Sequence, residues 1–239
     1  MKFVDISITE LIFSNLLVAG SILVSLLFTT KFYWKIILGA LRSFVQLLIV
    51  GYILRYIFTN NTWYLSLLTL LVMHVAAGFI CSDSIGISYK RLDFVFACFI
   101  SIFAGMILTF TITNLFVIKY TPWYRTNYLV PLSGMIIGNS ITAITLYHKT
   151  VVTGIKERQS FVRSLIAMGI NGKKAISDFT SRGYVTGLMP TVNAMMMLGI
   201  VKLPGMMTGQ IIGRGDVTQA IYYQIVIMFM IAFASSCSL

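Results

Sequence analysis

The chain has few of the residues on which soluble proteins and metalloenzymes depend. Only 7 of its 239 residues are Asp or Glu, 2 are His and 3 are Cys, and charged residues make up 10% of the total. Soluble domains carry about 25% charged residues. Because 58% of the residues are hydrophobic, the composition excludes a soluble domain and a disordered chain. It predicts an integral membrane protein.

The scarce reactive residues also fall in no catalytic pattern. Cys81, Cys98 and Cys237 stand singly, so neither a disulfide framework nor a structural zinc site is indicated. The two histidines, His74 and His148, form no ligand pair with metal-binding spacing. The sequence has no His-Glu-x-x-His, Gly-x-Ser-x-Gly or nucleotide-binding Gly-x-x-x-x-Gly-Lys-Ser/Thr motif. We therefore expect that the protein is not an enzyme, and that any uphill transport takes its energy from another protein.

Long apolar runs are abundant, and their lengths match a bilayer. A hydrocarbon core about 30 Å thick takes about 20 apolar residues as helix. Seven segments fit, roughly Ile8–Thr30, Ile36–Phe58, Trp63–Cys81, Phe94–Ile118, Tyr128–Tyr147, Gly183–Val201 and Val217–Leu239. The first lacks the basic start and the cleavage site of a signal peptide, so we expect an uncleaved helix. The sequence predicts an all-α, polytopic membrane protein in which residues 1–239 form a single transmembrane domain.

The surplus of basic residues, which gives a formal charge of +11, predicts the orientation of these helices. Lys and Arg concentrate in cytoplasmic loops. The richer set of alternate loops holds Lys31, Lys35, Lys90, Arg91, Lys149, Lys156, Arg158, Arg163, Lys173, Lys174 and Arg182, and the poorer set holds Lys2, Arg55, Lys119, Arg125, Lys202 and Arg214. We therefore expect the N-terminus outside and the C-terminus inside, in the inner or plasma membrane. Because the loops explain the charge, no nucleic-acid partner is expected.

The longest polar stretch, residues 148–182, is predicted to lie on the cytoplasmic side. Phe161, Leu165 and Met168 have the spacing of one helical face and predict a first helix. Gly169 and Asn171-Gly172 predict a break, and Lys173–Thr180 is predicted as a second short helical piece. Two interpretations stay open. The helix lies as an amphipathic helix on the membrane surface, or it docks a cytoplasmic partner.

Polar residues inside the apolar runs are the candidates for a transport pathway. In the second segment Gly39, Arg42, Ser43 and Gln46 share one helical face. A buried Arg within a membrane costs about 2.5–3.5 kcal/mol and normally faces water or the bundle interior. This face therefore indicates a polar pathway or an anion-facing site. Snorkelling of Arg42 toward the inner interface explains it equally well.

Two further segments combine glycine, proline and polar residues. The fifth segment carries Gly134-x-x-x-Gly138 followed by Asn139, a pattern that favours close helix packing. Between the last two segments, Pro204-Gly205 interrupts an apolar stretch. Such breaks mark transport sites or simple turns. Nearby methionines suit a soft metal or ordinary core filling, so no metal site is assigned; they are Met135, Met195 to Met197, Met206 and Met207.

Five stretches in register resemble the permease family of Fet-type iron-export ABC transporters (FetB), which includes the plant aluminium-sensitivity membrane permease. They cover the chain from about Lys31 to Met230, and they are Arg42–Phe58, Val130–Asn139, Leu188–Asn193, Leu203–Gly209 and Ala220–Gln224. Each stretch is generic alone. Their common order makes the resemblance specific.

The resemblance implies a permease, working as a homodimer in membrane lipid, that pairs with a separate ABC ATP-binding subunit. That partner would hold ATP and Mg, and this chain would need no cofactor. Residues 148–182 would be the coupling loop, because their turn resembles the family's Leu-Gly-Ala turn, although Met168 and Ile170 differ from the commoner residues. The coupling residues would be Leu165, Ala167, Met168, Gly169, Ile170 and Lys173.

Within the matching stretches, the candidate pathway residues are Arg42, Gln46, Pro131, Met135, Asn139, Pro190, Asn193, Pro204, Gly205, Met206 and Met207. Resemblance favours export of iron or another metal ion. A nucleotide-sugar or other anion remains an alternative, because the resemblance extends to plant members linked to nucleotide-sugar transport and because Arg42 suits an anion better than a cation. Asn193 stands where relatives can carry an acidic residue, so the resemblance does not carry a cation site over to this position. A stand-alone channel or ion-coupled carrier is a further alternative, although it would need acidic residues within the spans.

Overall fold

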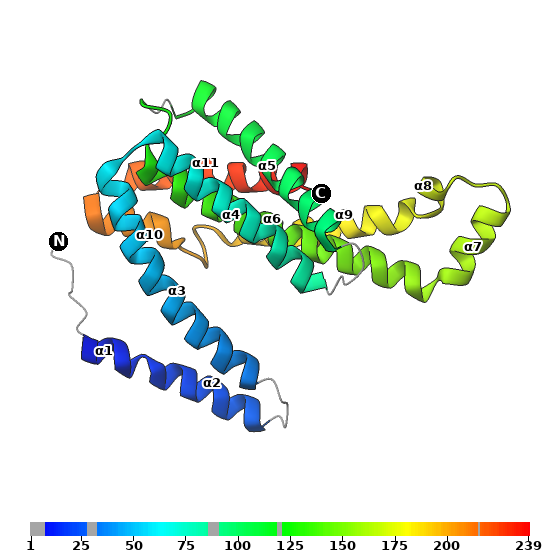
Figure 1. The fold of residues 1–239 in the computed structure, drawn as a ribbon, viewed down its shortest axis with the longest axis horizontal. Coiled ribbons are helices and arrows are strands. Elements are labelled where there is room, and N and C mark those ends of the chain that lie inside the picture. The colour runs from blue at the N-terminus through cyan, green and yellow to red at the C-terminus, as the bar shows by residue number, and fades with distance from the viewer. Residues whose placement is uncertain (1–7, 28–32, 86–90, 119–120, 215) are drawn as a thin grey trace. The chain divides into compact units, whose positions relative to one another are not determined.

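The computed structural model describes residues 8–27, 33–85, 91–118, 121–214 and 216–239. Within these ranges every regular element is a helix, apart from an isolated β-bridge between Leu198 and Lys202. The chain divides into two units, residues 1–60 and residues 61–239. We call them the N-terminal unit and the main unit (Figure 1).

The N-terminal unit consists of α1 (Ile8–Phe13), α2 (Asn15–Leu27) and α3 (Tyr33–Asn60). Ser14 separates the first two helices, and its backbone N–H donates to Glu10 at 3.1 Å. The first predicted segment is therefore two helices, and its last residues, 28–30, lie outside the described ranges. Helix α2 packs along α3, which is 28 residues long and apolar enough to cross a membrane.

Four long helices of the main unit are also long and apolar enough to cross a membrane: α4 (Trp63–Ile85), α5 (Arg91–Phe116), α6 (Thr126–Glu157) and α11 (Val217–Cys237). Their interior is a core of aliphatic and methionine side chains, including Leu70, Met106, Ile136 and Ile227. Their outer faces carry exposed Leu, Ile and Phe residues. Exposed apolar faces on long apolar helices are what lipid contact requires.

Two predicted spans, the first and the sixth, do not correspond to described helices that are both long and apolar enough to cross a membrane. Helix α2 has 13 residues, and α9 (Ser177–Met197) contains Asp178, Arg182 and several Ser, Thr and Gly residues that lower its hydropathy. After α9, Gly199 adopts a φ of +78°, a left-handed conformation that favours glycine. The chain then enters α10 (Gly205–Arg214), directly after Pro204.

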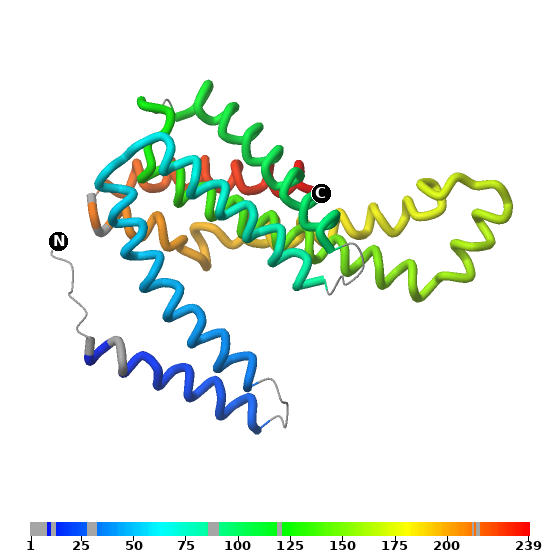
Figure 2. Tube along the Cα trace, viewed as in Figure 1, coloured from blue at the N-terminus to red at the C-terminus, as the bar shows by residue number. Residues whose placement is uncertain are grey.

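The helices α6 and α9 extend beyond the other helices of the main unit and carry α7 (Gln159–Ala167) and α8 (Gly172–Ala175) at their ends (Figures 1 and 2). We call residues 148–182 the arm. The arm has a small core of its own, formed by Val151, Val162, Ala175 and Phe179. It is thus a packed helical element rather than a loose loop.

The tip of the arm is a tight turn between α7 and α8. Gly169 has a φ of +85°, and the Ile170 N–H donates to the Leu165 carbonyl at 3.1 Å, which closes the end of α7. The Asn171 side chain accepts a hydrogen bond from the Lys173 N–H at 3.1 Å and caps α8. The predicted first helix and the break at Gly169 are confirmed, whereas the predicted second piece, Lys173–Thr180, is divided at Ile176 between α8 and the start of α9.

Close packing of α6 against α9 depends on glycines of α9. A Cβ atom at Gly183 would lie 2.6 Å from Cγ2 of Val151, and one at Gly187 would lie 2.9 Å from the carbonyl oxygen of Ala143. By contrast, a Cβ atom at Gly138 would meet nothing within 4 Å. Gly183 and Gly187 therefore allow α9 to approach α6 closely, whereas of the predicted pair only Gly134 has a near neighbour, Cε of Met73 on α4 at 3.3 Å from its Cβ position.

Candidate functional site

A cavity of about 150 Å³ lies where α6, α9, α11 and the segment between α9 and α10 meet. Helix α6 contributes Met135 and Asn139, α9 contributes Thr191 and Ala194, α11 contributes Gln224 and Met228, and the connecting segment contributes Lys202 and Pro204. On each helix these residues are three or four positions apart, so they share one face. Three predicted pathway residues, Met135, Asn139 and Pro204, come together here.

Gln224 is the most unusual residue of this cavity. Its side chain is 7% exposed, and its Oε1 atom has no hydrogen-bond partner among the described residues. An unpaired buried acceptor costs about 1–3 kcal/mol. Such a group in a cavity wall is suited to accept a hydrogen bond or to coordinate a cation that enters the cavity.

Asn139 supplies a second amide. Its Nδ2 atom donates to the Met135 carbonyl at 2.8 Å on the preceding turn. Because that bond uses an N–H group, the Oδ1 atom keeps its lone pairs as an acceptor. The site therefore offers two amide oxygens and the thioether sulfurs of Met135 and Met228.

These donors are neutral, and the charge of the site comes from Lys202. No group of three or more His, Cys, Asp or Glu side chains is placed to hold a metal within the described ranges. Neutral oxygen and sulfur donors bind a cation weakly and release it readily, as a conduction pathway requires. The same amides, together with Lys202, also suit an anion that carries hydroxyl groups.

The other predicted pathway residues of the main unit lie around this cavity without lining it. Pro190 and Asn193 are exposed on α9, whereas the Thr191 side chain is 5% exposed and faces the cavity. Pro131 is half-buried inside α6. Gly205, Met206 and Met207 form the first turn of α10, and Met206 packs against the main core.

Arg42 and Gln46 belong to the N-terminal unit. Both lie on α3, and both are exposed there. Their neighbour Ser43 donates its hydroxyl to the Ala40 carbonyl at 2.9 Å, within the same helix.

The predicted coupling residues all lie at the tip of the arm. Met168 is 70% exposed and Ile170 is 36% exposed, Ala167 and Lys173 are also exposed, and Leu165 is half-buried against the core of the arm. Ile166 and Phe161 add further exposed apolar surface, at 51% and 54%. The tip therefore presents apolar side chains on an otherwise basic helical element.

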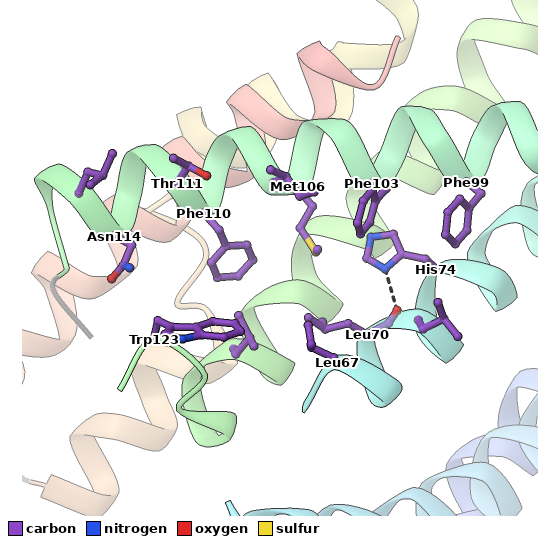
Figure 3. A pocket seen from close by; sticks show the side chains of 14 residues that line it. Leu67, Leu70, His74, Phe99, Phe103, Met106, Phe110, Thr111, Asn114 and Trp123 are labelled. Atoms are coloured by element: carbon purple, nitrogen blue, oxygen red, sulfur yellow. Dashed lines mark hydrogen bonds between the residues drawn. The ribbon is translucent and has the colours of Figure 1, made fainter. Parts of the chain in front are cut away.

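Another cavity, of about 580 Å³, lies between α4 and α5 (Figure 3). Its walls are apolar and aromatic, with Phe99, Phe103 and Phe110 along α5 and Trp123 from the following loop. His74 is fully buried there, and its Nδ1 atom lies 2.7 Å from the Leu70 carbonyl oxygen. These apolar walls give an ion no replacement for its hydration shell, so we place no pathway here.

The fold and the apolar helices define a multi-pass helical membrane protein. Comparison with known sequences then identifies its family: the profile of the uncharacterised protein family UPF0014 matches residues 8–239, and the chain belongs to this family. No solved structure matches the chain.

The relatives cover most of the chain. A UPF0014 membrane protein of Synechocystis is 32% identical over 198 residues, which are 82% of this chain and 75% of the relative. The "Probable iron export permease protein FetB" of Escherichia coli is 31% identical over 82% of this chain and 74% of its own length. "Protein ALUMINUM SENSITIVE 3" of Arabidopsis thaliana is 31% identical over 85% of this chain and 72% of its own length. The resemblance inferred from the sequence motifs is confirmed.

Sequence reasoning missed Gln224 as a site residue. It lies in the apolar part of α11, one turn and a half after Gln219, and it shares a face with Ala220, Ile227 and Ile231, which are all buried. Asking which polar side chain of each span faces the core would have found it.

Proposed function

We propose that this chain is the membrane permease subunit of an ABC transporter that exports iron or another metal ion, with ATP hydrolysis on a separate subunit. In this proposal two copies of the chain form a homodimer and bind two ATP-binding subunits, which hold ATP and Mg. The helices make seven crossings of the inner or plasma membrane, with α2 and α9 added to the five long apolar helices. The N-terminus is then outside, and the arm and the C-terminus are inside.

The observation that carries the proposal is the arm. Its tip exposes Met168 at 70% and Ile166 at 51%, on a turn whose ends are fixed by Gly169 and Asn171. An exposed apolar tip surrounded by basic residues is suited to a groove on a partner protein. The names of the relatives support a transport role, because one of them is called an iron export permease.

The path from the tip to the cavity supports the coupling role. Helix α6 runs without a break from Thr126 to Glu157, and it carries both Asn139 in the cavity and Val151 in the core of the arm. A rigid helix of this kind transmits a movement at the arm to the cavity as a rigid-body switch.

The experiment is reconstitution of the full chain with its proposed ATP-binding subunit, followed by measurement of ATPase activity and metal efflux in proteoliposomes. Met168→Asp should abolish stimulation of ATPase activity, because a charge enters the apolar contact. Ser160→Asp adds the same charge at an exposed position in the first turn of α7, at the opposite end of that helix from Met168, and should leave stimulation intact. Equal stimulation by both variants, or none with the unsubstituted chain, would refute the proposal.

Lys202 in the cavity wall favours a second candidate substrate, an anion such as a nucleotide-sugar. Efflux assays with both substrate classes separate the two. For metal export, Lys202→Gln should maintain or raise efflux, whereas for an anion it should lower efflux.

A further inference from the structure

A second polar cavity, of about 450 Å³, lies at the base of the arm between α6 and α9. Its lining brings together three cationic side chains, Lys149, Arg158 and Arg182, and two hydroxyl side chains, Thr150 and Thr153. Glu157 is the carboxylate of the lining. The cations outnumber it, so the cavity attracts anions.

Lys149 on α6 and Arg182 on α9 occupy corresponding positions in their helices. In α6 the described sequence from Thr126 to His148 has no Lys, Arg, Asp or Glu, and Lys149 is the first such residue. In α9 the charged residues end at Arg182, and none follows up to Met197. Lys149 and Arg182 therefore face one cavity at the point where both helices change from apolar to charged. In a membrane protein that point lies at the phosphate level of one leaflet.

The floor of the cavity is apolar and closely packed. Phe179 is 6% exposed, and a Cβ atom on Gly154 would lie 2.7 Å from its Cδ1 atom. The missing side chain at Gly154 thus lets the Phe179 ring lie against α6. An apolar floor beneath a cationic rim matches an amphiphile better than a free ion.

The cations are available to a ligand. In the part of the chain that the structure describes, the ion pairs are Arg91 with Asp83 and Arg182 with Asp178, so neither Lys149 nor Arg158 has a carboxylate partner there. The Arg182–Asp178 pair measures 2.8 Å, and its side chains are 60% and 61% exposed. Exposed pairs of this kind contribute little to stability, so a phosphate can replace the carboxylate.

We propose that this cavity binds the phosphate group of an anionic phospholipid from the adjacent leaflet. Lys149, Arg158 and Arg182 hold the phosphate oxygens, and Thr150 and Thr153 donate hydrogen bonds to the headgroup. The bound lipid joins α6 to α9 at the base of the arm. This site does not depend on which substrate the protein transports.

The test is native mass spectrometry of the detergent-purified full chain, titrated with phosphatidylglycerol or with phosphatidylcholine of the same acyl chains. The unsubstituted chain should retain phosphatidylglycerol in preference to phosphatidylcholine. Lys149→Gln and Arg182→Gln should each weaken phosphatidylglycerol binding roughly fivefold, because a basic residue near the headgroups contributes about that factor.

Two matched controls test whether weaker lipid binding in these variants results from a lost ion pair or from a general loss of positive charge. Asp178→Asn breaks the same ion pair as Arg182→Gln but keeps the cation, so it should maintain or strengthen lipid binding. Lys173→Gln with Lys174→Gln removes two positive charges from the tip of the arm and should leave binding unchanged. Weaker binding in either control, or no preference for phosphatidylglycerol in the unsubstituted chain, would overturn the proposal. Displacement of the lipid by an equal concentration of inorganic phosphate would show a free-anion site instead.

Discussion

Replacing Gly187 with alanine tests the contact between α6 and α9 most directly. The new Cβ atom would lie 2.9 Å from the Ala143 carbonyl oxygen, whereas ordinary contacts begin near 3.4 Å. Because this neighbour is backbone, the helices themselves must separate by about 0.5 Å in a close-packed interior. Overpacking of this kind typically costs 1–3 kcal/mol. The change also contributes about 1 kcal/mol in helix propensity, so the expected net loss is about 0–2 kcal/mol.

Gly138→Ala is the matched control, because it has the same helix-propensity gain on α6 and its Cβ atom meets nothing within 4 Å. The difference between the two variants therefore isolates the clash, at about 1–3 kcal/mol. The assay is unfolding of the full chain by a denaturing detergent in mixed micelles, with the free energy of unfolding fitted for each variant. Equal free energies for Gly187→Ala and Gly138→Ala would refute the packing argument.

The remaining predictions concern the cavity and the arm. Gln224→Leu removes an unpaired buried acceptor, so it should leave the free energy of unfolding unchanged or raise it by about 1 kcal/mol. Substrate efflux should fall. A clear loss of stability would show that the amide has a structural partner. Asn171→Ala removes the cap of α8 and should destabilise the arm by about 1 kcal/mol, seen as faster hydrogen exchange at Lys173 to Ala175 but not in α11. Gly169→Val places a β-branched residue at a φ of +85° and should destabilise the turn by about 1–3 kcal/mol. The expected results are loss of ATPase stimulation and faster hydrogen exchange in α7. Unchanged hydrogen exchange would contradict this prediction.

The positions of the long apolar helices could be predicted from hydropathy alone. The structure begins α4 at Trp63 and α11 at Val217, as predicted, and begins α6 at Thr126, two residues before the predicted start. The helix ends were predicted less well, because a charged residue ends an apolar run without ending backbone hydrogen bonding. For that reason α6 continues past Tyr147 to Glu157.

Contacts between helices were harder to predict. The Gly134-x-x-x-Gly138 and Gly183-x-x-x-Gly187 spacings look alike in sequence. Both glycines of the second lie close to α6, whereas in the first only Gly134 has a near neighbour, the Met73 side chain of α4. Helix α10 was missed, because Pro204 and Gly205 were interpreted as a break, although proline is also favoured at the start of a helix. Part of the cavity was anticipated through Asn139 and Met135, but the role of Gln224 depends on which way α11 faces.

The continuity of α6 fixes the rotational phase between its two ends. Asn139 near its middle and Gly154 near its end belong to one helix of 32 residues, so the direction in which the arm points is set by the number of residues between them. One inserted residue would turn the arm by about 100° and advance it by about 1.5 Å, whereas seven would bring it back to within about 20° of its original direction. The length of this segment, more than its composition, therefore determines which side of the transporter the tip of the arm can reach.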